Sequence, residues 1–499
     1  MTDTEFFASL SARAEEELKR WDMASLAIGV VKDGETVFAR GFGRRDIARD
    51  LPADADTLYQ IGSCSKAFTA ALVAILADRG QLDLDVPIRR YVPEVRLCDE
   101  LANKECTLRD LLCHRTGLPR HEYSWYGTDF TREELVEHMR YFEPSQPFRT
   151  VMQYCNYGFV LAGYIVEKIT GKTWEQNLQE LIFDPLGMTR TSCYVCDIEN
   201  DPNHAVPYDR TPNEITGRVE IPFYRTAVEN KELGIGAPFG PAGSINSTVQ
   251  DMLKWVSLFL NKGRAGEKQV ISESMAAEMI KPQMLRSNPL DLPNPETEFL
   301  CYGLGWFTEL FRGHKYVHHG GNINGFSAFT SFLPEQNLGI VAYTNMNSTF
   351  LHYALARVIA DHYLGAGEGD WPDRYYELTK SSNDGLPELL EHFTGKHQEG
   401  TAPSRPLAGY AGTFRRPGYS DMVIREEDGG LVMDYLGVKT PLKHFHYDTF
   451  VTGGIVGELP PGFPVHFRAA EVGGRIDTVK MPLVTEPGGA LVAFARTEE

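Results

Sequence analysis

A serine and a lysine three residues apart stand at the start of an apolar stretch of the chain. Ser63 and Lys66 lie in the run 61–66, and the apolar residues 67–76 follow directly. Residues three apart share one face of a helix. A serine hydroxyl becomes a nucleophile when a base takes its proton, and a lysine can be that base where burial lowers its pKa from about 10.4. The spacing therefore predicts an activated nucleophile at a helix N-terminus, where N–H groups favour a developing oxyanion.

A second group is a tyrosine and an asparagine separated by one residue. Tyr154 and Asn156 stand just before a helical pattern that ends near Thr170, with Gly171 as a stop signal. A phenol close to an ammonium group can carry protons to and from a nucleophile and a leaving group. Each motif alone also fits a simpler interpretation: a turn tyrosine with a capping asparagine here, and a capping serine with an exposed lysine at 63–66.

The third group places histidine and glycine on a predicted strand. The run Val317-His318-His319-Gly320-Gly321-Asn322 begins as a β-prone segment. Glycines in a strand let another backbone approach its edge closely, as an extended substrate would. Either His318 or His319 could be the functional histidine, because both are followed by glycine within two residues.

Taken together, these motifs resemble those of the serine β-lactamase, penicillin-binding-protein and esterase superfamily, in its class C-like peptidase branch. Residues 107–119 and 240–248 resemble further stretches of the same family, so that the similarity covers about residues 10–365. The resemblance implies a β-lactamase-like transpeptidase fold of the α+β class. In that fold an antiparallel sheet is made from N-terminal and C-terminal strands, with an all-helical region between them.

The resemblance also implies a role for each motif residue. Ser63 would be the acyl-accepting nucleophile, and Lys66 and Tyr154 the general-base pair. Asn156 would orient Lys66 and the substrate amide, and the N–H groups of Ser63 and Asn322 would form the oxyanion hole. The residues expected to bind the substrate are Asn156, His319, Gly321 and Asn322.

The third motif departs from the usual Lys-Thr-Gly of the family, because this chain has His-Gly-Gly. We favour His319 at the lysine position, since its distance to Gly325-Phe326 resembles the family spacing. His318 would then face the opposite side of the strand. Relatives with histidine here are commonly esterases, aminopeptidases or amidases. Histidine is largely neutral near pH 7, so we expect weak recognition of a substrate's terminal carboxylate and poor turnover of penicillins.

The elements that must position these residues follow from the hydrophobic pattern. The sequence predicts an amphipathic helix over 5–21 and a hairpin from strands 26–31 and 36–39 around Asp33-Gly34. Residues 63–300 are mostly helical in pattern. Later segments predict three strands and a helix, at 316–318, 326–333, 338–345 and 350–364.

Breaks in composition divide the chain into a catalytic domain over 1–365, a connector over 366–406 and a third segment over 407–499. The third segment has about eight short β-prone runs and predicts a small antiparallel β-barrel. It resembles the lipocalin-like domain appended to some members of this branch. Three roles stay open for it: shaping the active-site entrance, donating a loop to it, or mediating homo-oligomers.

The composition and charge of the chain make several classes of function improbable. The chain of 499 residues has a net charge of −19, which repels phosphate backbones, so nucleic acid is an improbable partner. The longest apolar stretch, 67–77, is far shorter than a membrane span of about 20 residues. The acidic N-terminus lacks the features of a secretory signal, and eight cysteines without a disulfide framework look like reduced thiols, which predicts a cytoplasmic protein.

We expect no metal and no cofactor. Cys193 and Cys196 have C-x-x-C spacing, but neither a second such pair nor a nearby histidine pair completes a tetrahedral site. The sequence thus predicts a serine hydrolase that acts through a covalent acyl-enzyme on small peptides, amides or esters, including peptides with D-residues. Two alternatives stay open: a penicillin-binding or sensor protein that acylates without turnover, and a peptide cyclase or acyltransferase of the same fold.

Overall fold

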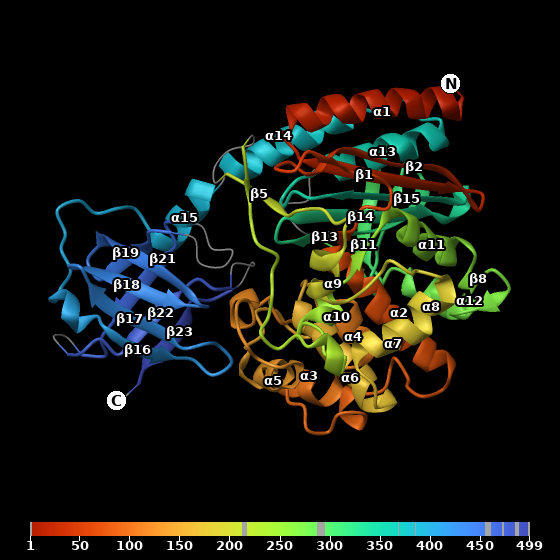
Figure 1. Ribbon diagram of the computed structural model, residues 1–499. Coiled ribbons are helices and arrows are strands. Elements are labelled where there is room, and N and C mark those ends of the chain that lie inside the picture. The colour runs from red at the N-terminus through yellow and green to blue at the C-terminus, as the bar shows by residue number, and fades with distance from the viewer. Residues whose placement is uncertain are drawn as a thin grey trace. The chain divides into compact units, whose positions relative to one another are not determined.

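The computed structural model of the protein describes residues 2–211, 217–286, 295–367, 369–384, 386–454, 461–471, 474–484 and 489–497 (Figure 1). The chain forms two compact units that alternate along the sequence. The first comprises Met1–Glu94, Lys104–Arg115 and Gly158–Asn383. The second comprises Val95–Asn103, Thr116–Tyr157 and Asp384–Glu499. The barrel segment and the Tyr154-x-Asn156 motif therefore belong to the same unit.

The first unit is built on a nine-stranded antiparallel sheet in the order β10-β11-β12-β13-β14-β15-β1-β2-β3. The strand bounds are β1 Ser25–Lys32, β2 Glu35–Asp46, β3 Leu51–Pro52, β10 Met284–Leu285, β11 Thr297–Tyr302, β12 Phe307–Phe311, β13 His314–Ile323, β14 Phe326–Leu333 and β15 Leu338–Thr344. The early strand β1 pairs with the late strand β15, which lies beside it in Figure 1. This pairing confirms the predicted sheet of N-terminal and C-terminal strands.

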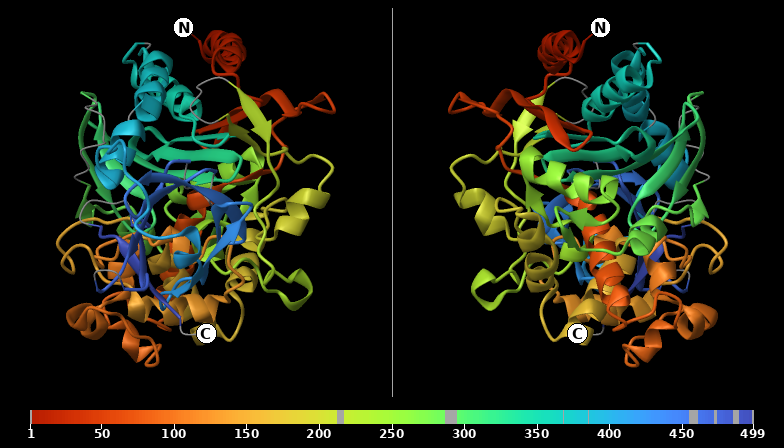
Figure 2. Two further views of the ribbon diagram at one scale, coloured as in Figure 1. Left: turned by 90° about the vertical axis from the view of Figure 1, so that its left-hand side faces the viewer. Right: turned by 90° about the vertical axis from the view of Figure 1, so that its right-hand side faces the viewer.

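Two helices cover one face of this sheet, α1 (Asp3–Arg20) and α13 (Leu351–Leu364), and Figure 2 shows both on the same side of it. Thr2 caps α1 in a reciprocal capping box with Glu5. Phe6 of α1 and Leu355 of α13 join Phe329 of the sheet in one apolar core. The strands β14 and β15 are buried along their whole lengths, and Ser327, Thr330 and Ser331 of β14 are buried together with its apolar residues.

The remaining elements of the first unit are mostly short. Among them, α11 (Val249–Leu260) packs on β1, β14 and β15. The other helices and strands that start in this unit are α2 Ser65–Asp78, α4 Leu108–Leu112, α7 Trp174–Leu178, α8 Asp184–Leu186, α9 Val195–Asn200, α10 Gly240–Gly243, α12 Glu273–Met279, α14 Trp371–Asp384, β4 Tyr59–Gln60, β5 Tyr208–Arg210, β6 Arg218–Glu220, β7 Asn246–Ser247, β8 Arg264–Ala265 and β9 Lys268–Gln269. The helix α6 (Asn156–Thr170) contains the boundary between the two units.

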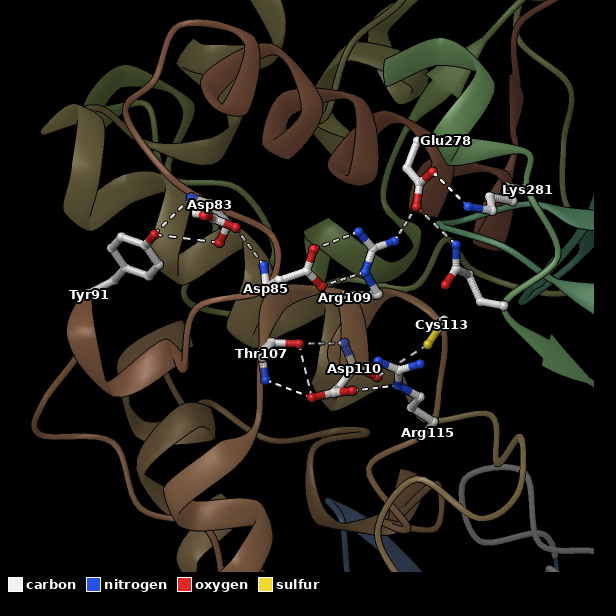
Figure 3. A network of polar contacts seen from close by, with 11 residues as sticks. Asp83, Asp85, Tyr91, Thr107, Arg109, Asp110, Cys113, Arg115, Glu278 and Lys281 are labelled. Atoms are coloured by element: carbon white, nitrogen blue, oxygen red, sulfur yellow. Dashed lines mark hydrogen bonds and ion pairs between the residues drawn. The ribbon is translucent and has the colours of Figure 1, made fainter. Parts of the chain in front are cut away.

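A polar network holds α4 in place (Figure 3). Thr107 and Asp110 form a capping box at its start, and Arg115 pairs with the buried Asp110. Arg109 joins Asp85, 2.6 Å away, to Glu278 of α12. These bonds hold α4, which is followed by Cys113 and then His114.

The second unit contains a closed barrel of antiparallel strands in the order β16 to β23, drawn in blue in Figure 1. Its bounds are β16 Gly412–Arg415, β17 Met422–Glu427, β18 Gly430–Tyr435, β19 Val438–His446, β20 Thr449–Thr452, β21 Pro464–Arg468, β22 Thr478–Met481 and β23 Val492–Arg496, and the helices of this unit are α3 Glu100–Glu105, α5 Arg132–His138 and α15 Leu386–Thr394. Aromatic side chains including Tyr410, Phe450 and Phe467 pack against one another. The predicted barrel is confirmed.

The segment predicted as a connector contains α14 and α15. Trp371 of α14 is 2% exposed and joins the core of the first unit. The domain boundaries at 365 and 406 stay predictions. Along the described part of the chain, the helices are too short or too polar to cross a bilayer.

Candidate active site

Ser63 lies in a 3₁₀ turn, Gly62–Cys64, directly before α2. The sequence predicted Ser63 in the first turn of the helix itself, whereas the structure places it in a tighter turn before the helix, where Gly62 adopts a left-handed φ of +50°. A Cβ atom at Gly62 would lie 2.9 Å from the backbone nitrogen of Asn322, so glycine is required by this close approach. The turn thus brings the Ser63 backbone to strand β13, with the Ser63 side chain half-buried.

Lys66 is fully buried on α2 and bonds directly to the serine. Its Nζ donates to Ser63 Oγ at 3.0 Å and to the carbonyl oxygen of Ala242 at 2.8 Å. The same Nζ lies 5.5 Å from the centre of the Phe159 ring. The structure therefore brings together the serine and the lysine that the sequence paired, in an environment largely screened from water.

Strand β13 passes so close to the serine turn that a side chain at Gly321 would clash with it. A Cβ atom at Gly321 would lie 1.9 Å from the carbonyl oxygen of Ile61 and 3.0 Å from the backbone nitrogen of Ser63. The next residue, Asn322, is exposed, and its Oδ1 accepts a hydrogen bond from Ser327 Oγ at 2.7 Å. The backbone nitrogens of Ser63 and Asn322 thus both lie near the point where the serine turn meets β13.

His319 is buried, and both of its ring nitrogens are bonded inside the protein. Nδ1 lies 2.6 Å from the Gly320 carbonyl oxygen, and Nε2 lies 2.9 Å from Tyr302 Oη. A carbonyl only accepts, so Nδ1 carries the hydrogen and Tyr302 donates to Nε2. Burial, with the nearby charge of Lys66, lowers the pKa of His319 to about 3. His319 is consequently a neutral group near pH 7.

His318 faces the other side of β13. Its Nε2 lies 3.6 Å from Glu309 Oε1, and Glu309 also pairs with the buried Arg357. Burial, followed by the charge of Arg357, lowers the pKa of His318 well below its usual value. The alternation predicted for the two histidines is present, and His319 is the one that lies near Lys66.

The sequence alone did not identify two aromatic side chains that lie near Lys66 and His319. Tyr302 binds His319, and its ring centre lies 4.7 Å from that of His114. The His114 ring in turn lies 5.2 Å from Phe159, beneath Lys66. Residues 107–119 were recognised as a family-like stretch, but nothing in the local pattern singled out His114. The contact of Tyr302 with His319 follows from the pairing of β11 with β12 and of β12 with β13, which the sequence alone does not reveal.

The Tyr154-x-Asn156 motif is described within the second unit. Tyr154 is half-buried, and the guanidinium carbon of Arg120 lies 5.1 Å from its ring centre. Asn156 is 8% exposed and begins α6, as the sequence predicted. Its Nδ2 donates to Glu122 Oε1 at 2.8 Å, and Glu122 also pairs with Arg120 at 3.0 Å. The motif alone could not reveal Arg120 and Glu122, which lie more than thirty residues earlier in the sequence.

The cysteines near the motifs are free thiols, as are the other cysteines of the chain. Cys64 donates its Sγ hydrogen to the His319 carbonyl oxygen at 3.2 Å, and burial raises its pKa to about 12. It is therefore a thiol and no competing nucleophile at neutral pH. Within the described residues, no three His, Cys, Asp or Glu side chains are grouped so that they could hold a metal ion.

Comparison with known families matches two parts of the chain. A model described as Beta-lactamase matches residues 10–364. A model described as Domain of unknown function (DUF3471) matches residues 396–494, which include most of the barrel.

Individual relatives cover most of the chain. Unguisins hydrolase ungD' of Aspergillus campestris (strain IBT 28561) is 27% identical over 452 residues, which are 86% of this chain and 80% of that protein. The octameric penicillin-binding protein homologue from Pyrococcus abyssi is 21% identical with a TM-score of 0.61, over 98% of this chain and 99% of the other. A class C beta lactamase from Rhodobacter sphaeroides is 23% identical with a TM-score of 0.55, over 72% and 98%. The two solved structures show the same fold.

Proposed function

Since the chain belongs to the Beta-lactamase family, we propose that it is a serine hydrolase that forms a covalent acyl-enzyme on Ser63. The observation that carries this proposal is the 3.0 Å hydrogen bond between the fully buried Lys66 Nζ and Ser63 Oγ. A base within hydrogen-bond reach is what a serine hydroxyl needs to attack a carbonyl carbon. The relative named as a hydrolase supports the same reaction type.

In the proposed reaction, Ser63 Oγ attacks the substrate carbonyl and its proton passes to the Lys66 and Tyr154 pair. The N–H groups of Ser63 and Asn322 stabilise the oxyanion. The pair returns the proton to the leaving amine or alcohol as the acyl bond breaks. Water then attacks the ester on Ser63, and the same groups reverse the proton transfer. Tyr154 is included because of its motif, and Phe159 beneath Lys66 lies only five residues later on α6.

The proposed substrates are small peptides, amides or esters, including peptides with D-residues. The neutral His319 supports weak selection for a terminal carboxylate, because a fixed cation is missing from the position of the family lysine. None of the proposed steps uses a metal or a cofactor. The free thiols fit a cytoplasmic location, and assembly of several copies stays a prediction.

Turnover separates this proposal from a sensor protein. A chromogenic p-nitrophenyl ester should release many equivalents of p-nitrophenol per protein, because water resolves the acyl-enzyme. A sensor that acylates and stalls would release about one equivalent and stop. A cyclase or acyltransferase would instead give aminolysis products in preference to the free acid when an amine is supplied, so product analysis by mass spectrometry completes the test.

The neutrality of His319 predicts a flat pH dependence for carboxylate recognition. Two substrates are compared that differ only at the terminus, which is a free carboxylate in one and an amide in the other. The ratio of their kcat/KM values, carboxylate to amide, should change less than about threefold between pH 5 and 8. The substrate carboxylate, with a pKa near 3.5, stays ionised throughout. His319→Lys should raise the ratio about tenfold, by adding a cation. A wild-type ratio that climbs tenfold as the pH falls through about 6.5 would mean that His319 titrates normally.

A further inference from the structure

Two neighbouring carbonyl oxygens of α10 accept hydrogen bonds from side chains of α2. Lys66 Nζ donates to the Ala242 oxygen at 2.8 Å, and Thr69 Oγ1 donates to the Pro241 oxygen at 2.7 Å. Lys66 and Thr69 are three residues apart, so they share one face of α2, and both are fully buried. Thr69 therefore holds the residue directly before the one whose carbonyl group contacts the proposed base.

The Thr69 hydroxyl is itself oriented by the indole of Trp174 on α7. Trp174 Nε1 lies 3.0 Å from Thr69 Oγ1, and both side chains are 0% exposed. An indole N–H only donates and a carbonyl oxygen only accepts, so the hydroxyl accepts from Trp174 and donates to Pro241. The reverse direction would set two donors against each other at one end and two acceptors at the other. This hydrogen-bonded chain consequently has a single orientation.

Close packing confines Pro241 from another side. A Cβ atom at Gly163 of α6 would lie 2.3 Å from Pro241 Cγ and 3.4 Å from Trp174 Cδ1. The proline ring thus lies directly against the α6 backbone, beside the indole. Protein interiors packed at this density transmit small shifts, because they hold little empty volume to absorb them. A displacement of Pro241 would therefore move the carbonyl group of Ala242, the next residue.

The Ala242 carbonyl group determines how Lys66 can act as a base. An amine that is ready to take a proton has two N–H groups and one lone pair, and a carbonyl oxygen binds only an N–H. With one N–H held by Ala242, the lone pair can point at Ser63 Oγ, which lies 3.0 Å from Nζ. In the proposed reaction the Ser63 proton passes to this lone pair, and the ammonium that forms keeps its bond to Ala242. Loss of this acceptor would let the amine rotate out of line.

We propose that Thr69 and Trp174 are positioning residues for the acyl transfer. They hold the Ala242 carbonyl group, and through it they keep the lone pair of Lys66 directed at Ser63. Neither side chain touches the substrate in this account. The inference rests on the proposed function, because it assigns the orientation of the base in the same reaction.

Thr69→Val tests the inference, since valine has a shape similar to that of threonine but no hydroxyl group. The variant should lower kcat for a p-nitrophenyl ester by about 10-fold to 100-fold, as expected for impaired general-base catalysis, and change KM less than about threefold. Thr69→Ser restores the hydroxyl and should return kcat to within about threefold of the wild type. An unchanged kcat in Thr69→Val, or an equal loss in the valine and serine variants, would overturn the role of the hydroxyl.

Coupling to Lys66 separates positioning from a general loss of structure. The rate at which a fluorophosphonate labels Ser63 is measured in the wild type, in Thr69→Val, in Lys66→Ala and in the double variant. Thr69→Val should slow labelling by about tenfold or more in the wild-type background. In the Lys66→Ala background it should slow labelling less than about twofold, because Thr69 acts through the lysine. Equal slowing in both backgrounds would overturn the proposal.

A pair of tryptophan variants gives an independent test, which also decides the matter if Thr69→Val does not fold. Trp174→Phe removes the N–H that orients Thr69 and should lower kcat about 3-fold to 10-fold. Trp255→Phe is the matched control. Trp255 is equally buried and stacks on Phe68 of α2 with 3.8 Å between ring centres, but its N–H has no hydrogen-bond partner within the described residues.

The control should leave kcat within about twofold of the wild type, because it removes a similar volume without touching the hydrogen-bonded chain. Equal losses of kcat in Trp174→Phe and Trp255→Phe would overturn the role of Trp174. Failure of the wild-type protein to label at Ser63 would instead refute the proposed function, so the two failures are distinguishable.

Discussion

Lys66→Ala and Tyr154→Phe should each lower kcat by about 10³-fold or more, and the double variant should lose little beyond the worse single one. Groups that move one proton act as a unit, so removing either disables both. Because Lys66 Nζ lies 3.0 Å from Ser63 Oγ, the lysine is the first proton acceptor proposed in this account. The measurement is steady-state kcat with a p-nitrophenyl ester for all four proteins of the cycle.

Lys168→Ala is the matched control, because Lys168 also lies over a tyrosine ring, at 4.6 Å, but is exposed on α6. It should change kcat less than about twofold, as is usual for surface substitutions. If the separate losses for Lys66 and Tyr154 multiply in the double variant, the two residues act independently and the shared-proton mechanism is wrong.

Gly321→Ala should reduce kcat by about 10²-fold to 10³-fold, the usual effect of losing one oxyanion donor. The new Cβ atom would lie 1.9 Å from the Ile61 carbonyl oxygen, so β13 has to move away from the serine turn and take the Asn322 N–H with it. The change should appear in kcat for ester hydrolysis, with the protein still folded by circular dichroism.

Gly320→Ala provides the comparison one residue away. Its Cβ would meet the hydroxyl of Tyr353, which is the far end of a side chain on the opposite face of the strand. Tyr353 packs against Phe329 and Tyr375, so the variant should lower the melting temperature, whereas kcat should fall less than about tenfold because the clash lies away from the serine turn. Equal kcat losses in the two variants would show that the close approach at Gly321 is not what sets the oxyanion hole.

Patterns of local spacing predicted much of the fold and part of the site. The interval between Ser63 and Lys66 placed both on one face, and the alternation of a strand separated His318 from His319. The β-prone, largely apolar runs 326–333 and 338–345 predicted the strands β14 and β15. These features depend on residues close together in the sequence, where periodicity carries the information.

The sequence alone could not predict contacts between segments that are far apart in the chain. Tyr302 meets His319 because three strands pair in register, and Glu122 meets Asn156 across more than thirty residues. The grouping of residues 116–157 with the barrel likewise has no local signature. A single sequence gives the side-chain types and their hydrophobic periodicity. It does not show which distant loop a tyrosine such as Tyr419 contacts.

The most direct test of the account is the identity of the acylated residue. After brief exposure to a fluorophosphonate, peptide mapping by mass spectrometry should find one adduct on the peptide that contains Ser63, and Ser63→Ala should carry none. The neighbouring Ser65 is fully buried and its Oγ accepts a hydrogen bond from the Ile245 N–H at 3.1 Å, so it should stay unmodified. A stoichiometric adduct that persists in Ser63→Ala, on Ser65 or on Ser244, would contradict the central claim that Ser63 is the nucleophile.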